Sequence, residues 1–292
     1  MYYGNIAASI GMLSAFQRVP VIWSIHHSLY DITTEKPLTR SLIRLAAILS
    51  SKVSAIAYCS GVAADQHEAM GFDPRRRAVI YNGIDCNEFK PPPNGRQPLP
   101  SWLPVPAGRC VIGSVGRWHP MKNQAGLLLA VAALVRQGYD LHCIFVGPGH
   151  ENGELVRHAR KLEIADRISV TGTEANIPNF MKSIDIHAIS SAWGGAFSIA
   201  TAEAMASGLP TVVTDVGDCP FVDGDTGLVA AQKDPDALAA AIRQLVDMSP
   251  DARARMGRNA RRRVIENFSL DQHVARHLAL YEEVMARRAL DS

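Results

Sequence analysis

Two basic residues in one short segment have the types and spacing to hold a phosphate-bearing ligand. Arg117 and Lys122 follow an apolar run that ends at Val115, and Gly116 lies between that run and the two cations. Ligands of parallel α/β sheets bind beyond the carboxyl ends of the strands, where a glycine lets the backbone approach a ligand closely. A planar guanidinium and a compact ammonium together suit a diphosphate. The spacing alone leaves an ordinary pair of solvated loop charges equally open.

A second candidate segment, residues 190–210, follows an apolar run that ends at Ile189. Its glycine-containing loop leads into a predicted helix of small residues, which Gly208 and Pro210 bring to an end. The free N–H groups at the start of such a helix are suited to an anion. Glu203 lies among alanines in this helix, and a buried carboxylate is costly unless it is hydrogen-bonded. We favour a ligand hydroxyl as its partner over a backbone group or an arginine.

The elements that would position these residues follow an α/β pattern. Short runs rich in Val and Ile alternate with longer helical patterns, which is typical of parallel sheets covered on both faces. The predicted strands are residues 21–25, 53–58, 78–81, 110–115, 141–146, 168–171, 184–189 and 211–214. The predicted helices include residues 5–17, 125–137, 154–162, 200–207, 234–248, 251–267 and 270–288.

A proline-rich stretch at residues 91–107 interrupts this pattern, and a strand–helix–strand pattern starts again at Cys110. Because proline removes backbone donors and disfavours the α region before it, the stretch is interpreted as a linker between two α/β domains, with a long surface loop as the alternative. The first half has only three predicted strands. A mononucleotide-binding half usually has a longer βαβαβ run, so the first domain is expected to be incomplete at its N-terminus.

Composition bounds the class of protein. With 292 residues, 47% of them hydrophobic, the chain can form more than one core. A net charge of +2 and an aromatic fraction of 7% do not suggest nucleic acid as a partner. The five cysteines form no C-x-x-C pair, which argues against a disulfide framework or zinc site and for a reducing compartment. The sequence shows no apolar run of roughly 18 residues and no signal-peptide pattern, so we expect a cytoplasmic protein.

Two arginine clusters are weaker signals. Arg75, Arg76 and Arg77 are consecutive in the first half, and the penultimate predicted helix carries six arginines, at positions 253, 255, 258, 261, 262 and 263. Such clusters can attract anionic lipid headgroups or phosphate-rich acceptors. For the second cluster we prefer a solvated helix face with local acidic partners.

Several segments, in this order and spacing, resemble family-4 glycosyltransferases of the GT-B fold, the glycosyl transferases group 1. They are Val-Ile-Tyr-Asn-Gly-Ile-Asp at 79–85, Ser-Val-Gly-Arg at 114–117 with Lys122, Phe-Val-Gly-Pro-Gly at 145–149, and Glu-Ala-Met-Ala-Ser-Gly-Leu-Pro at 203–210 followed by Thr-Asp-Val-Gly at 214–217. The last is the most specific of them. The resemblance runs through most of the chain.

The resemblance implies two Rossmann-like domains with parallel sheets, facing a cleft. Residues 1–90 would form a shortened acceptor-side domain, 91–107 the linker and 108–268 the nucleotide-sugar-binding domain. Residues 269–292 would form a C-terminal helix that packs back towards the N-terminal domain. The implied reaction transfers a sugar from a nucleotide-diphosphate donor to a saccharide or lipid-linked acceptor, with retention of anomeric configuration. The resemblance implies neither a cofactor nor a required metal.

The resemblance also implies roles for individual residues. Arg117 and Lys122 would hold the diphosphate, and Glu203 would bind the ribose hydroxyls. Main-chain groups near Thr173 and Glu174 would meet the base. His26 would lie by the donor sugar and the acceptor, although the adjacent His27 leaves the choice between them open. The remaining implied donor-binding residues are Gly116, Gly195, Ala196, Phe197, Ser198 and Ile199.

One departure from the family bears on activity. The family usually has a second glutamate eight positions before Glu203, where this chain has Gly195. That glutamate contacts hydroxyls of the donor sugar, so Gly195 leaves space without an acceptor group. A catalytically impaired nucleotide-sugar-binding relative is therefore the main alternative, and a nucleotide-sugar epimerase of the same fold is a third reading. The basic clusters add an expectation of peripheral contact with the inner membrane surface.

Overall fold

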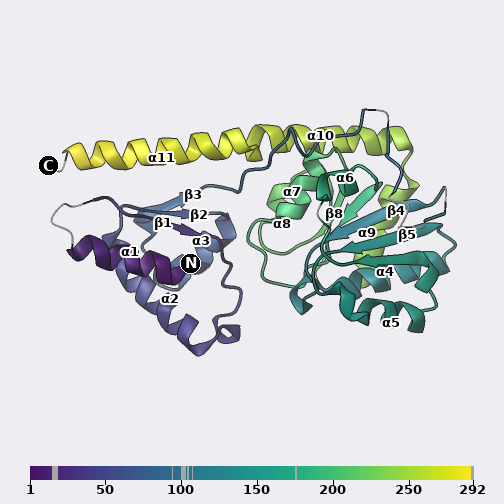
Figure 1. Cartoon of the computed structure of the whole chain (residues 1–292), viewed down its shortest axis with the longest axis horizontal. Coiled ribbons are helices and arrows are strands. Elements are labelled where there is room, and N and C mark those ends of the chain that lie inside the picture. Colours follow the sequence, from purple (N-terminus) through teal and green to yellow (C-terminus); the bar gives the residue numbers. More distant parts are fainter. Residues whose placement is uncertain are drawn as a thin grey trace. The chain divides into compact units, whose positions relative to one another are not determined.

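A computed structural model of the chain describes residues 1–14, 19–93, 95–99, 103, 105–106, 108–174 and 176–290. It divides into two compact units. Unit 1 comprises Met1–Gly83, Gly194–Phe197 and Leu270–Ser292, and unit 2 comprises Ile84–Trp193 and Ser198–Ser269. Each unit has its own parallel sheet with helices on its faces (Figure 1). The predicted α/β fold with parallel sheets is confirmed.

Unit 1 is built on a parallel sheet in the order β1-β2-β3. Its strands are β1 (Ile22–Ile25), β2 (Ala55–Tyr58) and β3 (Arg77–Val79), and its helices are α1 (Tyr2–Ser14), α2 (Pro37–Leu49), α3 (Gly61–Ala69) and α11 (Leu270–Leu290). Because side chains alternate along a strand, β2 feeds both faces. Ile56 and Tyr58 join the core under α1, α2 and α3, and Ala55 and Ala57 pack with α11. Both sides of the sheet are thus covered (Figure 1).

Unit 2 has a parallel sheet of six strands in the order β6-β5-β4-β7-β8-β9. The strands are β4 (Cys110–Val115), β5 (Leu141–Val146), β6 (Ile168–Thr171), β7 (Ile186–Ala188), β8 (Thr211–Thr214) and β9 (Leu228–Ala230). The helices are α4 (Gln124–Arg136), α5 (Glu154–Lys161), α6 (Ile177–Met181), α7 (Ile199–Ala206), α8 (Cys219–Asp223), α9 (Pro235–Asp247) and α10 (Pro250–Phe268). The strand order reverses between β4 and β7. In open parallel sheets such a reversal creates a crevice at the carboxyl ends of the strands, where ligands bind.

The eight predicted strands are all present, with ends shifted by at most two residues. The sequence patterns named no helix at α2 and missed the edge strand β9 and the short helices α6 and α8. The lengths of β9, α6 and α8, three to five residues, give too few positions for a period to show. Helix α1 begins at Tyr2, three residues before the predicted 5–17 segment, and is described as far as Ser14. Residues 15–17 of that segment lie outside the described residues, as do residues 94, 100–102, 104 and 107 of the proline-rich stretch and residues 291–292.

Unit 2 begins at Ile84. Residues 84–90, predicted as the end of the first domain, and the described residues of 91–107, predicted as a linker, therefore belong to unit 2. Two contacts hold the proline-rich stretch on that unit. Arg96 forms an ion pair with Asp185 at 2.7 Å, and the Gln97 amide donates to the Lys182 carbonyl at 2.9 Å. The described part of the stretch is therefore an anchored segment of the second unit.

The prediction that the α10 arginines pair with acidic residues is wrong for three of them. Arg253 donates to three carbonyls at the end of α9. Arg261 donates to the carbonyl of Ala206, the last residue of α7, and to the carbonyls of Cys86 and Phe89. Arg263 donates to the carbonyls of Phe221 and Val222 in α8. Because the last carbonyls of a helix lack partners within it, these guanidinium groups cap three helices. Arg255, Arg258 and Arg262 are exposed.

The Arg75–Arg77 cluster is paired locally. Arg75 forms an ion pair with Asp73 at 2.9 Å, and Arg77 pairs with Asp65 at 2.6 Å and Glu68 at 3.2 Å. Most of the positive charge that suggested an anionic partner is therefore compensated within unit 1. Among the described residues, no helix combines the length and the apolar character needed to cross a bilayer.

Candidate functional site

Backbone packing fixes the loop that follows β4. The Gly116 amide donates to the Val146 carbonyl at 2.8 Å, and the His150 side chain donates from Nε2 to the Gly116 carbonyl at 2.9 Å. Gly147 has a φ of 145°, and a Cβ there would overlap the Gly116 carbonyl oxygen. At Gly116 an added Cβ would meet only the Lys122 side chain, at 4.0 Å. The glycine that the fold requires at this edge is therefore Gly147, and Gly116 leaves space open beside Lys122.

A short turn presents Lys122. The 3-10 turn Pro120–Lys122 is followed by Asn123 in the left-handed region, with φ 48° and ψ 41°, directly before α4. Asparagine is one of the few residues other than glycine that tolerate this conformation. Gln124 is buried and donates from Nε2 to the Arg117 carbonyl at 2.8 Å. The backbone between Arg117 and Lys122 is thus closed into a compact loop.

Hydrogen bonds tie this loop to the segment after β7. Ser190 Oγ donates to the carbonyls of Lys122 and Asn123, at 3.0 and 2.9 Å, and the Ala192 amide donates to the Met121 carbonyl at 2.8 Å. Since β4 and β7 are neighbours at the reversal of strand order, these bonds join the two loops that border the crevice. The structure therefore brings together the two segments that the sequence singled out.

The two cations at this edge lack acidic partners in the described part of the chain. Arg117 is exposed and Lys122 is half-buried, and neither forms an ion pair with a described residue. Burial lowers the pKa of Lys122 from its ordinary value, and the Arg117 charge acts in the same direction against the opposing effect of the Cys219 thiol. A partly desolvated ammonium beside a second cation favours an anionic ligand, because the ligand supplies the charge that the protein does not.

Glu203 lies on α7 and is half-buried, and its carboxyl group has no hydrogen-bond partner among the described residues. Burial raises the pKa of its carboxyl group to about 7, and the nearby Glu88 carboxylate adds to this effect. Among the described residues, neither a backbone group nor an arginine side chain forms a hydrogen bond with the Glu203 carboxyl group. A carboxylate left in this state is suited to accept hydrogen bonds from a ligand.

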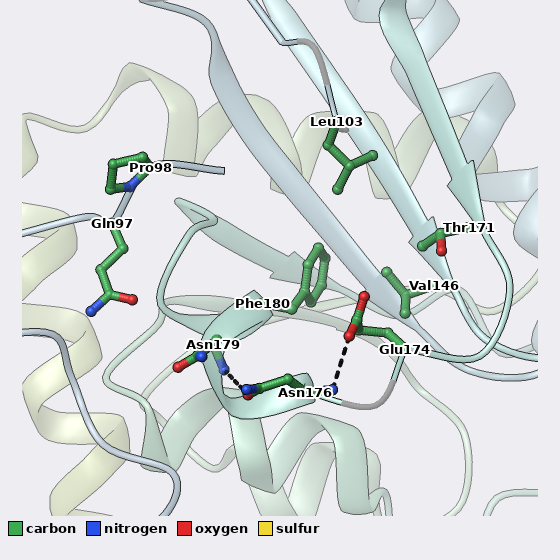
Figure 2. A pocket seen from close by; sticks show the side chains of 9 residues that line it. All are labelled: Gln97, Pro98, Leu103, Val146, Thr171, Glu174, Asn176, Asn179 and Phe180. Carbon is green, nitrogen blue, oxygen red and sulfur yellow. Dashed lines mark hydrogen bonds between the residues drawn. The ribbon is translucent and has the colours of Figure 1, made fainter. Parts of the chain in front are cut away.

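A cavity of about 280 Å³ opens beside the ends of β5 and β6, next to the predicted base-binding residues. It is lined by Gln97, Pro98, Leu103, Val146, Thr171, Glu174, Asn176, Asn179 and Phe180. Figure 2 shows the Glu174 carboxylate reaching in beside Phe180 and Val146. One of its oxygens accepts from the Asn176 amide at 2.9 Å. The volume is near the lower end of small-molecule pockets, about 300–1,000 Å³. Thr173 is exposed and lies one residue before Glu174.

The remaining residues predicted to bind the donor fall in both units. Ser198 precedes α7 and its hydroxyl lies 2.8 Å from that of Thr201, while Ile199 is exposed. Gly195, Ala196 and Phe197 belong to unit 1, where the Phe197 ring lies 6.0 Å from that of Tyr81. These residues have no side-chain charge, so contacts to a donor would be made by their backbone, by apolar surface or by the Ser198 hydroxyl.

His26 lies in unit 1, directly after β1, and is exposed. Its Nε2 is 2.8 Å from the Ser24 hydroxyl. His27 engages both ring nitrogens inside the unit, with the Tyr2 hydroxyl at 3.2 Å and Glu35 at 3.2 Å. His26 is therefore the histidine of the pair that is open to a ligand. Its place beside a donor sugar and an acceptor stays a prediction.

Sequence reasoning missed the residues that hold the loops in place. Gln124 and Ser190 act through backbone carbonyls, and nothing in their type or spacing distinguishes them from ordinary polar residues. Asn123 carried a usable signal, since an asparagine just before a helical pattern is a common site for an unusual backbone angle. Gly147 was noticed only as part of a motif, because a close approach to another loop cannot be read from local sequence.

The match to known proteins agrees with this geometry. A model of the family described as glycosyl transferases group 1 matches residues 101–263, and a model described as Glycosyltransferase Family 4 matches residues 3–88. The first match covers more than half of the chain and includes both loops of the crevice. The chain belongs to the glycosyl transferases group 1 family.

Two curated relatives in this family are mannosyltransferases by name. The lipopolysaccharide core biosynthesis mannosyltransferase LpsB of Rhizobium meliloti is 30% identical over 71% of this chain and 61% of its own length. The MMP alpha-(1->4)-mannosyltransferase of Mycolicibacterium hassiacum is 28% identical over 98% of this chain and 71% of its own length. The chain thus spans only about three fifths of LpsB.

Solved structures agree on the fold. HepE of Anabaena, crystallised in complex with UDP, is similar with a TM-score of 0.85 and 24% sequence identity, over 98% of this chain and 77% of HepE. A sucrose-phosphate synthase of Thermosynechococcus elongatus is similar with a TM-score of 0.80 and 19% identity, over 98% of this chain and 72% of that one. At these identities the likeness establishes the fold, which is the GT-B arrangement that the sequence motifs resembled.

The state of Glu203 predicts how stability depends on pH. Its folded pKa of about 7 lies above the ordinary value of 4.5, so the folded chain binds a proton more tightly than the unfolded chain. Stability should therefore fall as pH rises from about 4.5 to about 7, and stay low above that. Glu203→Gln removes this loss and should raise the free energy of unfolding near pH 8 by about 3 kcal/mol, at about 1.4 kcal/mol per pKa unit. Urea unfolding from about pH 5 to about pH 8 measures it.

The matched control is Glu266→Gln, which removes an exposed carboxylate from the same unit. Its unfolding curves should follow those of the unmodified chain at every pH. Parallel pH profiles for Glu203→Gln and the unmodified chain would mean that Glu203 is solvated or paired after all.

Proposed function

We propose that the chain binds a nucleotide-diphosphate sugar at the carboxyl edge of unit 2 and transfers the sugar to a saccharide or lipid-linked acceptor, with retention of anomeric configuration. The observation that carries the proposal is the pair of cations, Arg117 and Lys122, that no described acidic side chain pairs, in the loop after β4 at the reversal of strand order. The family membership of the chain and the names of its relatives support it.

In this proposal the diphosphate lies against Arg117 and Lys122. Bond cleavage at the anomeric carbon leaves negative charge on the departing diphosphate, and two fixed cations in a partly desolvated site stabilise that charge. The open space beside Gly116 lets a phosphate approach the backbone, and the N–H groups at the start of α7 favour the same anion. The nucleotide sugar is a substrate, and the proposal includes no resident cofactor and no required metal.

The nucleoside end of the donor would contact Glu203 and enter the cavity beside Glu174 in unit 2. Glu203 accepts hydrogen bonds from the ribose hydroxyls, which would compensate for its burial. The base enters the cavity beside Thr173 and Glu174, where Phe180 and Val146 offer apolar surface and the loop offers backbone groups. The backbone of residues 195–199 contacts the donor, and His26 of unit 1 acts next to the sugar and the acceptor. The cysteine pattern supports a cytoplasmic setting.

The main alternative is a relative that binds nucleotide sugars without transferring them. Gly195 favours it, because this position offers no side-chain acceptor for sugar hydroxyls. A screen of several nucleotide sugars that records both binding and sugar release separates the two readings. Binding with release or transfer supports the enzyme, and binding without either supports the alternative.

We expect Arg117→Ala and Lys122→Ala each to weaken binding of a nucleoside diphosphate by about 1.5–3 kcal/mol, the range for hydrogen bonds to charged groups. Isothermal titration calorimetry with UDP, GDP and ADP measures this. Arg255→Ala is the matched control, since it removes an exposed arginine from α10 of the same unit. Undiminished affinity in a folded Arg117→Ala/Lys122→Ala double variant would refute the assignment of the diphosphate.

The role given to Glu203 predicts a difference between sugars of the nucleotide. Glu203→Gln should weaken binding of a ribonucleoside diphosphate more than binding of its deoxyribose counterpart, because a carboxylate that accepts from ribose hydroxyls has less to lose when one of them is absent. Calorimetry with both nucleotides at about pH 8, where the carboxylate is ionised in the unmodified chain, gives the comparison. Equal losses would indicate that Glu203 acts on the ligand in some other way.

A further inference from the structure

A groove with a volume of about 580 Å³ lies in unit 2, apart from the residues assigned to the donor. It is lined by the proline-rich stretch, the connection from α6 to β7, the turn between α7 and β8, and the first turns of α10. The two connections lead into the amino ends of β7 and β8, whereas the donor loops follow the carboxyl ends of β4 and β7. The volume is within the range of small-molecule pockets, about 300–1,000 Å³.

Close backbone packing fixes the walls of this groove. Gly208 has a φ of 77°, and a Cβ there would come within 2.8 Å of the Pro91 side chain. Gly257 of α10 lies so close to Gly208 that a Cβ on it would overlap the Gly208 carbonyl oxygen. The ion pair between Arg96 and Asp185 holds the proline-rich stretch against the connection from α6 to β7. The groove is therefore formed before a ligand binds, which lowers the entropic cost of binding.

Positive charge is in excess along the groove. Lys182, Arg253 and Arg258 line it, and none of them forms an ion pair with a described residue. Arg253 donates instead to three carbonyls at the end of α9. The one acidic residue of the described lining, Asp185, already forms an ion pair and accepts from the Val111 amide at 2.8 Å. A concave surface lined mainly by one sign of charge attracts ligands of the opposite sign.

The same groove offers apolar surface. Met181, Ile184 and Leu209 line it and are buried, and prolines at positions 91, 92, 210 and 250 surround them. An inorganic anion would use the positive charge and leave the apolar surface in contact with water. An organic anion satisfies both, because its apolar part covers the proline and leucine side chains while its charged group contacts the basic ones.

We propose that this groove binds an organic phosphate. The basic side chains of the lining hold the phosphoryl group, since ammonium and guanidinium groups form charge-assisted hydrogen bonds with phosphate oxygens. Helix α10 begins at Pro250 in the wall of the groove, and the positive end of its dipole favours the same anion. The inference goes beyond the proposed function, because Arg117, Lys122 and Glu203 are not part of the lining.

The test is isothermal titration calorimetry with 1-naphthyl phosphate, which joins an apolar ring system to a phosphoryl group. The chain should bind it at one saturable site that remains in Arg117→Ala/Lys122→Ala, the double variant in which the donor edge is disabled. Inorganic phosphate supplies the charge alone and 1-naphthol supplies the apolar part alone. Each should bind this double variant about tenfold or more weakly than 1-naphthyl phosphate, the order of loss for a hydrogen bond to a charged group.

Two further variants address the groove itself. Lys182→Gln/Arg258→Gln should weaken binding of 1-naphthyl phosphate about tenfold, and Arg255→Gln/Arg262→Gln is its control, since both arginines are exposed on α10 outside the lining. Ala254→Trp places a large ring in the groove from an exposed position of α10 and should abolish binding. Its control is Ala240→Trp, at an exposed alanine of α9. Both controls should bind as the unmodified chain does.

Circular dichroism establishes that each variant is folded. Nucleoside-diphosphate binding by the groove variants should equal that of the unmodified chain, so a failure here is distinguishable from a failure of the proposed function. Three results would overturn the proposal: no saturable site for 1-naphthyl phosphate in Arg117→Ala/Lys122→Ala, equal affinity for 1-naphthol and 1-naphthyl phosphate, or undiminished binding by Ala254→Trp.

Discussion

The reversal of strand order beside β4 is the constraint on which the candidate site depends. Strand β4 has parallel neighbours on both sides, β5 and β7. Right-handed connections on the two sides of such a strand run over opposite faces of the sheet. The loops after β4 and β7 therefore border a crevice at the carboxyl ends of these strands. The hydrogen bonds from Ser190 to the carbonyls of Lys122 and Asn123 then hold the two loops together. Gly147, packed on the Gly116 carbonyl, fixes the outer side of the same loop.

Partial burial of unpaired charged side chains at this site costs folding free energy. Lys122 is partly desolvated without an anion, and Glu203 is partly desolvated without a donor. Elsewhere in unit 2 the α10 arginines cap the ends of three helices, but both ring nitrogens of His187 and one carboxylate oxygen of Asp223 are buried without a hydrogen-bond partner in the described structure. Unpaired polar groups are thus not confined to the crevice, and the family motifs are what assign Lys122 and Glu203 to a ligand. Such conflicts between stability and local environment are expected where a ligand completes the structure.

Features set by local sequence could be predicted, whereas features that depend on contacts between distant segments could not. The core strands were predictable because runs such as 141–146 are buried along their whole length, and the motifs marked Arg117, Lys122 and Glu203. The capping by Arg253, Arg261 and Arg263 was not predictable, since their partners are backbone carbonyls contributed by other helices. The unpaired state of Glu203 could be suspected from its apolar neighbours but needed the three-dimensional surroundings.

The central claim is that the uncompensated charges around the reversal of strand order form the site of a nucleotide diphosphate. A crystal structure of the chain with a bound nucleoside diphosphate tests it most directly. The account predicts phosphate oxygens within hydrogen-bonding distance of Arg117 and of Lys122 Nζ, and ribose hydroxyls that donate to the Glu203 carboxylate. A nucleotide bound elsewhere on the chain, with Lys122 and Glu203 left without ligand contacts, would contradict the account.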